Sequence, residues 1–231
     1  MQDSSKQAVA EFLQTKTYKT VLDVPSGNGW LQKMLPGNAK IDGVDLFESK
    51  PSGYRNFWQH DLDDGLPDIK ESYDLICCCE GIEHVGNPLS LLRAFYQRLN
   101  VEGTLIITTP NIWYPQSRMQ FLIRGFFPSF PSLVDEQIHF GQHMHITPWS
   151  YPQLYLYLKL SGFGIPALIN EPLSKPKHSF ERLLGLPAKF YCNGKLKKSK
   201  TEEERNFWLI AGTSGSRLGR HLIVQAEKEK V

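Results

Sequence analysis

Short apolar runs alternate with longer amphipathic ones through the first half of the chain. Helices are expected where apolar residues recur every three or four positions, at residues 5–14, 30–35 and 88–99. Strands are expected in the short runs between them, at residues 20–24, 40–45, 56–60, 73–79 and 103–109. Strands that alternate with helices are typical of strand–helix–strand units. The pattern therefore predicts an α/β domain built on a parallel sheet.

The pattern changes after Pro110. Residues 111–145 are rich in Phe, Pro, Ser and His and show no clear period. Because this stretch is longer than most connections inside a compact domain, we expect a functional loop. A helix at 149–160 and strands at 163–169 and 221–225 are predicted after it.

Residues 172–219 form the least regular part of the chain. They contain a basic run followed by three glutamates at 202–204, which we interpret as a solvated loop that leads into a helix. The basic run consists of Lys195, Lys197, Lys198 and Lys200.

Length and composition favour one folded domain. The chain has 231 residues, 41% hydrophobic and 22% charged, which excludes wholesale disorder. Its formal net charge of +2 gives no reason to expect a nucleic-acid partner. No apolar run is long enough for a transmembrane segment, since residues 121–134 are interrupted by Arg124 and by prolines. Three adjacent cysteines, Cys77 to Cys79, suggest packed thiols, and with an N-terminus unlike a signal peptide we expect a cytoplasmic protein.

A glycine-rich turn carries the strongest chemical pattern. In residues 21–30 a strand leads to Gly27 and Gly29, after which a helix is expected, so that backbone could approach a ligand closely. The dinucleotide motif GxGxxG is not matched, because its third glycine would fall at Gln32. The phosphate-loop motif is not matched either, because the Gly194–Lys195 pair is followed by leucine.

Two acidic residues end the neighbouring strands. Asp23 precedes the glycines, where a carboxylate suits an ammonium group better than a pyrophosphate. Asp45 follows at the spacing where an acidic side chain meets ribose hydroxyls in such folds. Together they suggest an amine-bearing nucleoside. The alternatives are that Asp23 only caps the turn and that Asp45 only ends a strand.

These segments resemble a known family. The sequences DVPSGNG (23–29), HDLDDGLP (60–67), YDLICCCEGIEHV (73–85) and GTLIITTPN (103–111), with Asp45 between the first two, are similar to the class I S-adenosylmethionine-dependent methyltransferases. The similarity covers roughly residues 18–170 and is greatest to the branch of ubiquinone-biosynthesis-type, small-molecule and sugar methyltransferases.

The resemblance implies a Rossmann-like α/β fold. Its seven-stranded, mostly parallel sheet would have helices on both faces. We expect a single domain with a core at 18–170 and 219–227, a lid or acceptor loop at 111–147, and an insertion at 172–218 before the last strand. The resemblance also implies S-adenosyl-L-methionine as the cofactor.

The family's cofactor contacts carry over to matching positions. The methionine part of the cofactor would lie against Asp23, Pro25, Gly27 and Gly29. Its ribose would contact Asp45 and Leu46. Its adenine would contact Asp61 and the backbone of Leu62, and its sulfonium side Glu80, Gly81 and Ile82. Pro25 departs from the glycine that the family often has there.

Histidines are the candidates for activating an acceptor hydroxyl, since a base of this kind works near neutral pH. His84 directly follows the fourth strand, and three more precede Thr147–Pro148: His139, His143 and His145. Each histidine could instead cap, pack or belong to plain loop structure.

A metal site is an alternative that we do not include in the predicted site. In an extended chain His143 and His145 would share a face, and Glu83 or Asp135 could add a carboxylate. The aromatic stretch 121–134 could form a lid, a homodimer contact or a surface for a lipid-like substrate, or it could pack in the core.

The sequence thus predicts methyl transfer to an oxygen atom of a small-molecule or glycan-linked acceptor. A nucleic-acid substrate is disfavoured, because CEGIEHV follows the fourth strand in place of the Asn/Asp-Pro-Pro-aromatic motif. The alternatives are a non-catalytic subunit that binds the cofactor and a protein methyltransferase.

Overall fold

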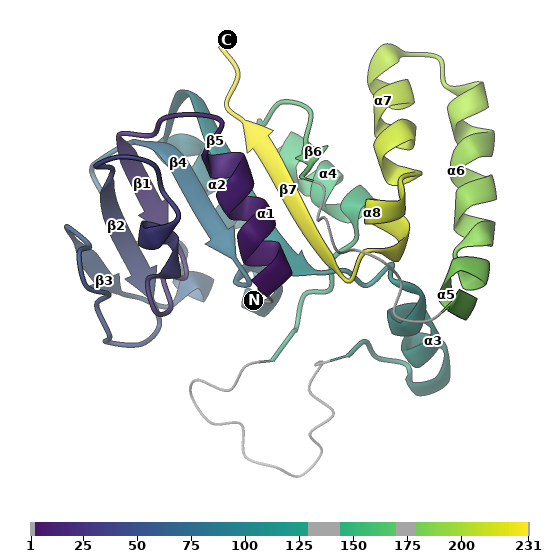
Figure 1. Ribbon diagram of the computed structural model, residues 1–231, viewed down its shortest axis with the longest axis horizontal. Coiled ribbons are helices and arrows are strands. Elements are labelled where there is room, and N and C mark those ends of the chain that lie inside the picture. Colours follow the sequence, from purple (N-terminus) through teal and green to yellow (C-terminus); the bar gives the residue numbers. More distant parts are fainter. Residues whose placement is uncertain (1–2, 129–143, 170–178, 231) are drawn as a thin grey trace.

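A seven-stranded sheet forms the centre of the computed structural model, which describes residues 3–128, 144–169 and 179–230 (Figure 1). Its strand order is β3-β2-β1-β4-β5-β7-β6. The first five strands are parallel, and β7 runs antiparallel to both of its neighbours. The predicted mostly parallel sheet of seven strands is confirmed. The strands are β1 (Thr20–Asp23), β2 (Lys40–Asp45), β3 (Phe57–Gln59), β4 (Tyr73–Cys79), β5 (Leu99–Pro110), β6 (Ala167–Leu168) and β7 (His221–Glu227).

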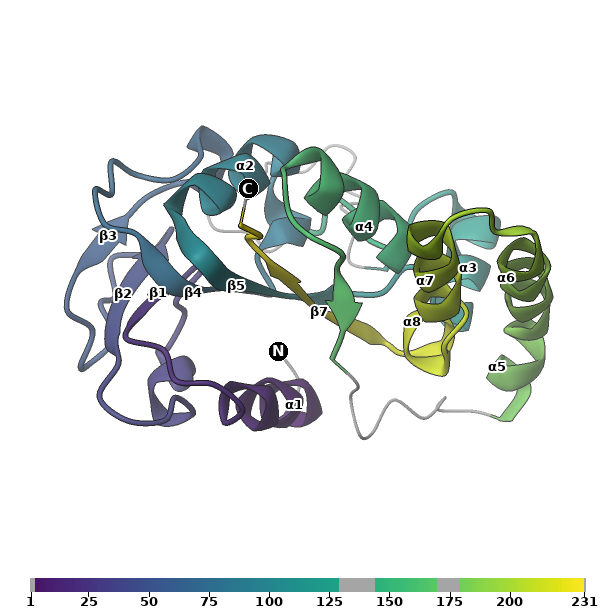
Figure 2. The same ribbon diagram turned by 90° about the horizontal axis from the view of Figure 1, so that it is seen from above.

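Helices cover both faces of the sheet, as predicted. Figure 2 shows α1 on one face and α2 and α4 on the other, while α3 and α5 to α8 gather beyond the β7 side. Among the described residues, no helix combines the length and apolar composition needed to cross a bilayer. The α-helices are α1 (Asp3–Leu13), α2 (Pro88–Arg98), α3 (Pro115–Arg124), α4 (Tyr151–Leu160), α5 (Ser179–Leu184), α6 (Leu186–Lys198), α7 (Glu202–Ala211) and α8 (Ser214–Leu218). The 3₁₀ helices are η1 (Trp30–Lys33), η2 (Leu62–Asp64) and η3 (Ile82–His84).

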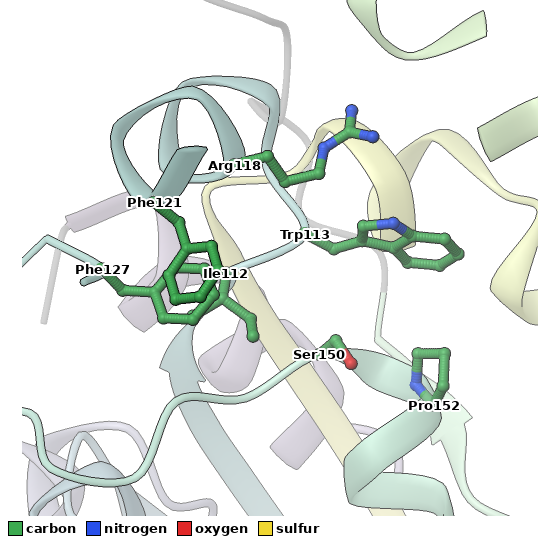
Figure 3. Close-up of a pocket in the computed structure, with 7 residues that line it drawn as sticks. All are labelled: Ile112, Trp113, Arg118, Phe121, Phe127, Ser150 and Pro152. Carbon is green, nitrogen blue, oxygen red and sulfur yellow. The ribbon is translucent and has the colours of Figure 1, made fainter. Parts of the chain in front are cut away.

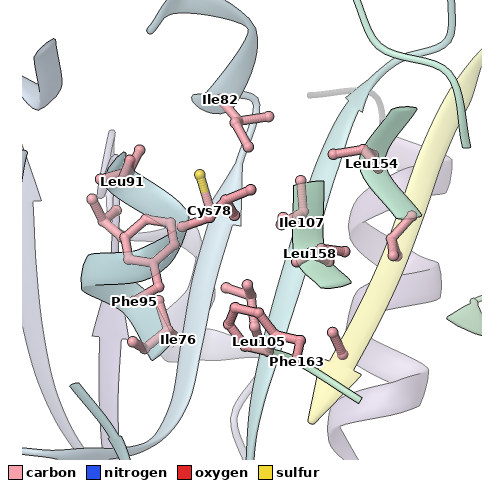
Figure 4. Packing of buried hydrophobic residues seen from close by; sticks show 14 of the residues in the cluster. Ile76, Cys78, Ile82, Leu91, Phe95, Leu105, Ile107, Leu154, Leu158 and Phe163 are labelled. Carbon is pink, nitrogen blue, oxygen red and sulfur yellow. The ribbon is translucent and has the colours of Figure 1, made fainter. Parts of the chain in front are cut away.

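Alternating side chains of β4 and β5 divide the core between the two faces. Ile76 and Cys78 pack with Phe95 of α2 and Leu158 of α4 (Figure 4), whereas Cys77 belongs to the cluster that α1 covers. Because successive strand residues point to opposite faces, one apolar run fills both clusters. The adjacent cysteines are free and buried, which confirms the prediction of packed thiols.

Two predicted elements are shorter in the structure. The helix predicted at 30–35 is the single 3₁₀ turn η1, because only a few residues separate Gly29, in the left-handed region, from the helix-breaking Pro36. The strand predicted at 163–169 is the two-residue β6. Phe163 instead packs edge-on against Tyr96.

The stretch predicted to lack regular structure after Pro110 contains α3. This helix begins at Pro115, a residue suited to the first helical turn, and Gly125 with φ 78° follows its last residue. Its side chains at Leu122 and Ile123 are 78% and 76% exposed. The helix therefore leaves apolar side chains in solvent instead of burying one face in the core.

The region before β7 is helical in its described part. The basic run predicted as a loop lies largely in the last turn of α6, where lysines complement the negative end of the helix dipole. The predicted helix after it is confirmed as α7, whose Thr201 cap accepts a hydrogen bond from the amide of Glu204.

Candidate functional site

The glycine turn lies at the carboxyl edge of the sheet and depends on two glycines. Gly29 has φ 72°, and a Cβ there would lie 2.5 Å from Cβ of Pro51. Gly27 has φ 50°, yet a Cβ there would meet nothing within 4 Å. Gly29 is thus required for packing, whereas Gly27 borders open space that a ligand could use.

Asp45 holds this turn in place. Its Oδ2 atom accepts a hydrogen bond from the amide of Gly27 at 2.8 Å, and Oδ1 accepts one from the amide of Phe47 at 3.1 Å. The amide of Ser26 also donates to the carbonyl of Val44 in β2. Asp45 therefore does more than end a strand: its carboxylate shapes the turn after β1. Leu46, next in the chain, is half-buried at the same edge.

Asp23 lies buried beneath the turn. Its Oδ2 atom accepts a hydrogen bond from the hydroxyl of Tyr54 at 2.5 Å, and Oδ1 has no partner among the described residues. Burial raises the pKa of this carboxyl well above its ordinary value. In the described ranges no backbone amide donates a hydrogen bond to the carboxylate of Asp23. Tyr54, which the sequence analysis did not identify, is the residue that positions it.

Asp61 and Leu62 lie after β3, the strand beside β2. The amide of His60 donates to the carbonyl of Asp45, which joins the ends of these two strands. Asp61 caps η2 by accepting a hydrogen bond from the amide of Asp63, and it is exposed. Asp61 and Asp45 therefore follow adjacent strands at the same edge.

The end of β4 touches the glycine turn. A Cβ at Gly81 would lie 2.3 Å from Cδ of Pro25, so a glycine here allows the two segments to approach. Ile82 is buried in the core. Pro25, which the resemblance places beside the methionine part of the cofactor, therefore packs against the end of β4.

Glu80 lies between the glycine turn and β7. It has φ 54°, unusual for a residue other than glycine. Its Oε1 atom accepts a hydrogen bond from the hydroxyl of Thr108, and Oε2 lies 3.6 Å from Nε2 of His221. Burial alone would raise the pKa of Glu80, but His221 and Thr108 outweigh it and the pKa is lowered.

A cavity of about 240 Å³ opens beside Glu80, where β4 and β5 end and β7 begins. We call it the sheet-edge cavity. His221 lines it, although the sequence analysis did not identify this residue. The antiparallel direction of β7 brings the start of that strand to the end of β5, where Pro110 pairs with His221. Other residues lining the cavity include Glu80, Glu83, Asn111, Ile112, Phe127, His145 and Trp149.

Glu83 and His145 line this cavity, and His84 lies next to them. One ligand atom from each lies within 4.8 Å of the other two. The amides of Ile146 and Thr147 both donate to the carbonyl of Glu83, at 2.9 and 3.0 Å. These hydrogen bonds bring the later segment, and with it His145, to the end of β4. The rings of His84 and His145 meet edge-on with centroids 4.9 Å apart.

The cluster has the chemistry of a cation site. Glu83 is 2% exposed, and neither carboxylate oxygen has a hydrogen-bond partner among the described residues. Burial, with the nearby charge of Glu80, raises the pKa of Glu83 to about 8. Nδ1 of His84 lies 2.8 Å from the carbonyl of Met144, the contact that orients a ligating imidazole. A carboxylate with two imidazoles suits a divalent transition metal.

Two of the predicted histidines cannot be placed. His139 and His143 lie outside the described residues, as does Asp135. Of the four candidates the structure therefore brings together His84 and His145. The metal alternative predicted from the sequence keeps Glu83 and His145 but takes His84 as its second imidazole.

Comparisons with known proteins identify the family and the fold. A family profile described as a methyltransferase domain matches residues 1–165. The ubiquinone biosynthesis O-methyltransferase of Pseudomonas savastanoi pv. phaseolicola is 33% identical over an alignment 107 residues long, which covers 40% of this chain. The match spans 45% of that relative's length, less than half of it.

Solved structures share the fold. The YcgJ protein of Bacillus subtilis superposes with a TM-score of 0.58 at 16% identity, over 98% of this chain and 100% of that one. A Burkholderia thailandensis 1,6-didemethyltoxoflavin-N1-methyltransferase gives a TM-score of 0.52 at 13% identity, over 99% and 79% of the two chains. Because the family match covers more than half of the chain and the fold agrees, the chain belongs to the methyltransferase-domain family, in class I of the S-adenosyl-L-methionine-dependent methyltransferases.

Proposed function

We propose that the protein transfers a methyl group from S-adenosyl-L-methionine to an oxygen atom of a small-molecule or glycan-linked acceptor. The observation that carries this proposal is the convergence of Glu83 and His145 on the sheet-edge cavity, with His84 next to them. Methyl transfer is a displacement at a carbon that sulfonium already activates, so alignment and removal of the acceptor proton are what the protein must supply.

The cofactor would lie along the carboxyl edge of the sheet. Asp45 and Leu46 would meet the ribose, and Asp61 and Leu62 the adenine. The methionine part would follow the turn of Asp23, Pro25, Gly27 and Gly29. The open space at Gly27 and the approach of Gly81 to Pro25 support this placement. The sulfonium would then face Glu80, Gly81 and Ile82, next to the sheet-edge cavity.

Glu83, His84 and His145 would hold a divalent cation. A bound cation lowers the pKa of a hydroxyl that approaches it, which makes the oxygen a better nucleophile at neutral pH. The buried carboxylate of Glu83, whose oxygens have no hydrogen-bond partner in the described part of the chain, favours this role, because a cation would compensate its negative charge. A histidine base without metal is the second candidate, and it rests on His145 at the cavity wall.

Transfer of a radiolabelled methyl group to a pooled metabolite extract tests the proposal. We expect a labelled fraction whose formation EDTA abolishes and Mn²⁺ or Zn²⁺ restores. Glu83→Gln and His145→Ala should each lower the rate at least 10-fold, whereas Glu102→Gln, which alters an exposed glutamate of β5, should not.

Other outcomes separate the alternatives. Labelling that resists EDTA but needs His145 would support the histidine base over the cation. Label found only in proteins would support a protein methyltransferase. Cofactor binding by calorimetry without any labelled fraction would support the non-catalytic subunit and refute the proposal.

A further inference from the structure

The sheet-edge cavity adjoins two further cavities along α3. It shares Ile112 and Phe127 with a second cavity of about 260 Å³ (Figure 3). That cavity in turn shares Arg118 and Phe121 with a third, of about 460 Å³, along α3. We call the three together the α3 trough. Its lining residues extend from Glu83 to the outer surface of α3. An acceptor longer than the sheet-edge cavity could therefore place the part that does not react along α3.

The walls of the α3 trough are largely apolar. The rings of Phe121 and Phe127 stack with centroids 4.4 Å apart and form one side of the second cavity. Trp113 lies on another side of this cavity (Figure 3). Met119, Leu122 and Leu184 continue the wall in the third cavity. Apolar walls of this kind bind a hydrocarbon or ring-bearing body by burying it from water.

Arg118 is the charged group in the second and third cavities. Figure 3 shows its side chain next to Trp113, on the side of the cavity away from Phe127. One guanidinium nitrogen donates to the carbonyl of Leu184 at 3.1 Å, while Nε is buried without a partner among the described residues.

No carboxylate offsets the charge of Arg118 within the described part of the chain. The charge that acts on it is that of Arg217, and burial together with this like charge lowers its pKa. Residues 111–128 contain two arginines and no acidic residue. A partly buried cation with an unpartnered N–H is stabilised when an anion binds it, and a guanidinium matches the planar oxygens of an oxyanion.

We propose that the acceptor is an anionic amphiphile and that Arg118 selects it. A carboxylate or phosphate group would bind Arg118, an apolar body would lie along Phe121, Phe127 and Trp113, and the reacting hydroxyl would reach the sheet-edge cavity. This inference rests on the proposed function for the identity of the reaction. The binding of the anion at Arg118 stands on the geometry of the trough alone.

Binding of short amphiphiles tests the proposal without any methyl transfer. Octyl phosphate, octanoate and octanol are titrated into the full chain by calorimetry. We expect the anion that matches the natural acceptor to bind at least 10-fold more tightly than octanol. The tighter of the two anions identifies the group as phosphate or carboxylate. Equal binding of all three probes would overturn the proposal.

Variants of the two α3 arginines supply the control. Arg118→Gln should weaken the preferred anion about 10-fold or more, as expected for a charge-assisted hydrogen bond, and leave octanol unchanged. Arg118→Lys should keep the preference for an anion in weaker form. Arg124→Gln, on the same helix but outside the trough lining, should bind all probes like the natural chain. Unchanged anion binding in Arg118→Gln would refute the role of this residue.

Failure of this inference can be told apart from failure of the proposed function. Cofactor affinity is measured in the same proteins with S-adenosyl-L-methionine alone. Arg118→Gln should leave that affinity unchanged, because Arg118 lines the second and third cavities rather than the glycine turn. A folded Arg118→Gln protein, checked by circular dichroism, that binds the cofactor but still prefers the anion would refute the inference alone.

Discussion

The carboxylate of Asp45 at the end of β2 accepts a hydrogen bond from the amide of Gly27 in the turn after β1, at 2.8 Å. This hydrogen bond joins the ends of two adjacent strands. Each carboxylate oxygen of Asp45 accepts one backbone hydrogen bond and retains the capacity to accept another. The residue can therefore shape the turn and still bind ribose hydroxyls.

Asp45→Ala should harm both cofactor affinity and stability. Loss of the carboxylate leaves the amide of Gly27 without its partner, which costs about 1–3 kcal/mol if the amide stays buried. We expect S-adenosyl-L-methionine to bind at least 10-fold more weakly by calorimetry. Asp68→Ala, an exposed aspartate paired with Lys70, serves as the control and should change neither quantity. Unchanged affinity of Asp45→Ala for S-adenosyl-L-methionine would show that the cofactor does not bind at this position.

Alanine at Gly27 should separate ligand binding from stability. Gly27 and Gly37 both have positive φ, 50° and 74°, and neither has an atom within 4 Å of a Cβ position. Each substitution therefore carries a similar backbone cost of about 1–2 kcal/mol, measurable by urea unfolding. Only Gly27→Ala should also weaken cofactor binding, because its Cβ would occupy the space beside the turn. Equal cofactor affinity in the two variants would contradict this placement.

Buried strands are the elements that the sequence predicted best. The bounds of β2 and β4 agree with the prediction, and both strands are almost wholly buried. β5 begins earlier than predicted, directly after α2. Glu102 within it has φ 64°, and the register with β4 shifts near its start. An irregular strand of this kind has no regular alternation to read.

The parts of the candidate site that could be predicted are those that form recognisable local motifs in the sequence. The glycine turn and Asp45 come from local motifs and lie together as the sequence suggested. The convergence of His145 on His84 depends on backbone hydrogen bonds to Glu83 from a segment far along the chain. His221 enters the cavity because β7 is antiparallel. Local periodicity predicts neither contacts between distant segments nor the direction of a strand in the sheet.

Acid should unfold the protein partly through Asp42. This buried carboxylate accepts hydrogen bonds from Nε of Arg55 at 3.0 Å and from the hydroxyl of Tyr73 at 2.9 Å. Burial alone would raise its pKa, but these contacts outweigh burial and the pKa is lowered. A carboxyl whose pKa is lower in the folded state stabilises the fold above its unfolded pKa of about 3.9. That stability is lost as pH falls through the folded-state pKa.

Asp42→Asn should therefore unfold more easily at pH 7, by about 1.5–3 kcal/mol for the lost charged hydrogen bonds. Its free energy of unfolding should also fall less steeply than that of the natural chain as pH is lowered below 4. Urea titrations at several pH values measure both effects. Asp68→Asn provides a contrast, because Asp68 also has a lowered pKa, caused by Lys70, but is exposed and screened by solvent. A parallel pH dependence in Asp42→Asn and the natural chain would contradict the assignment.

His221 should control the pH dependence of cofactor binding through Glu80. Glu80 lies beside the proposed sulfonium position, and its ionised form would favour that positive charge. His221, 3.6 Å from Glu80, is one of the groups that lower the pKa of this carboxyl against the effect of burial. His221→Ala should therefore raise the pKa of Glu80 and move the acidic midpoint of cofactor affinity to higher pH. His221→Gln, which can still donate a hydrogen bond, should move it less.

Calorimetry with S-adenosyl-L-methionine across pH measures the shift without an acceptor. His145→Ala, which also alters a histidine lining the cavity, should leave the midpoint in place. If both histidine variants moved the midpoint equally, the effect would belong to the cavity as a whole and not to the contact between His221 and Glu80.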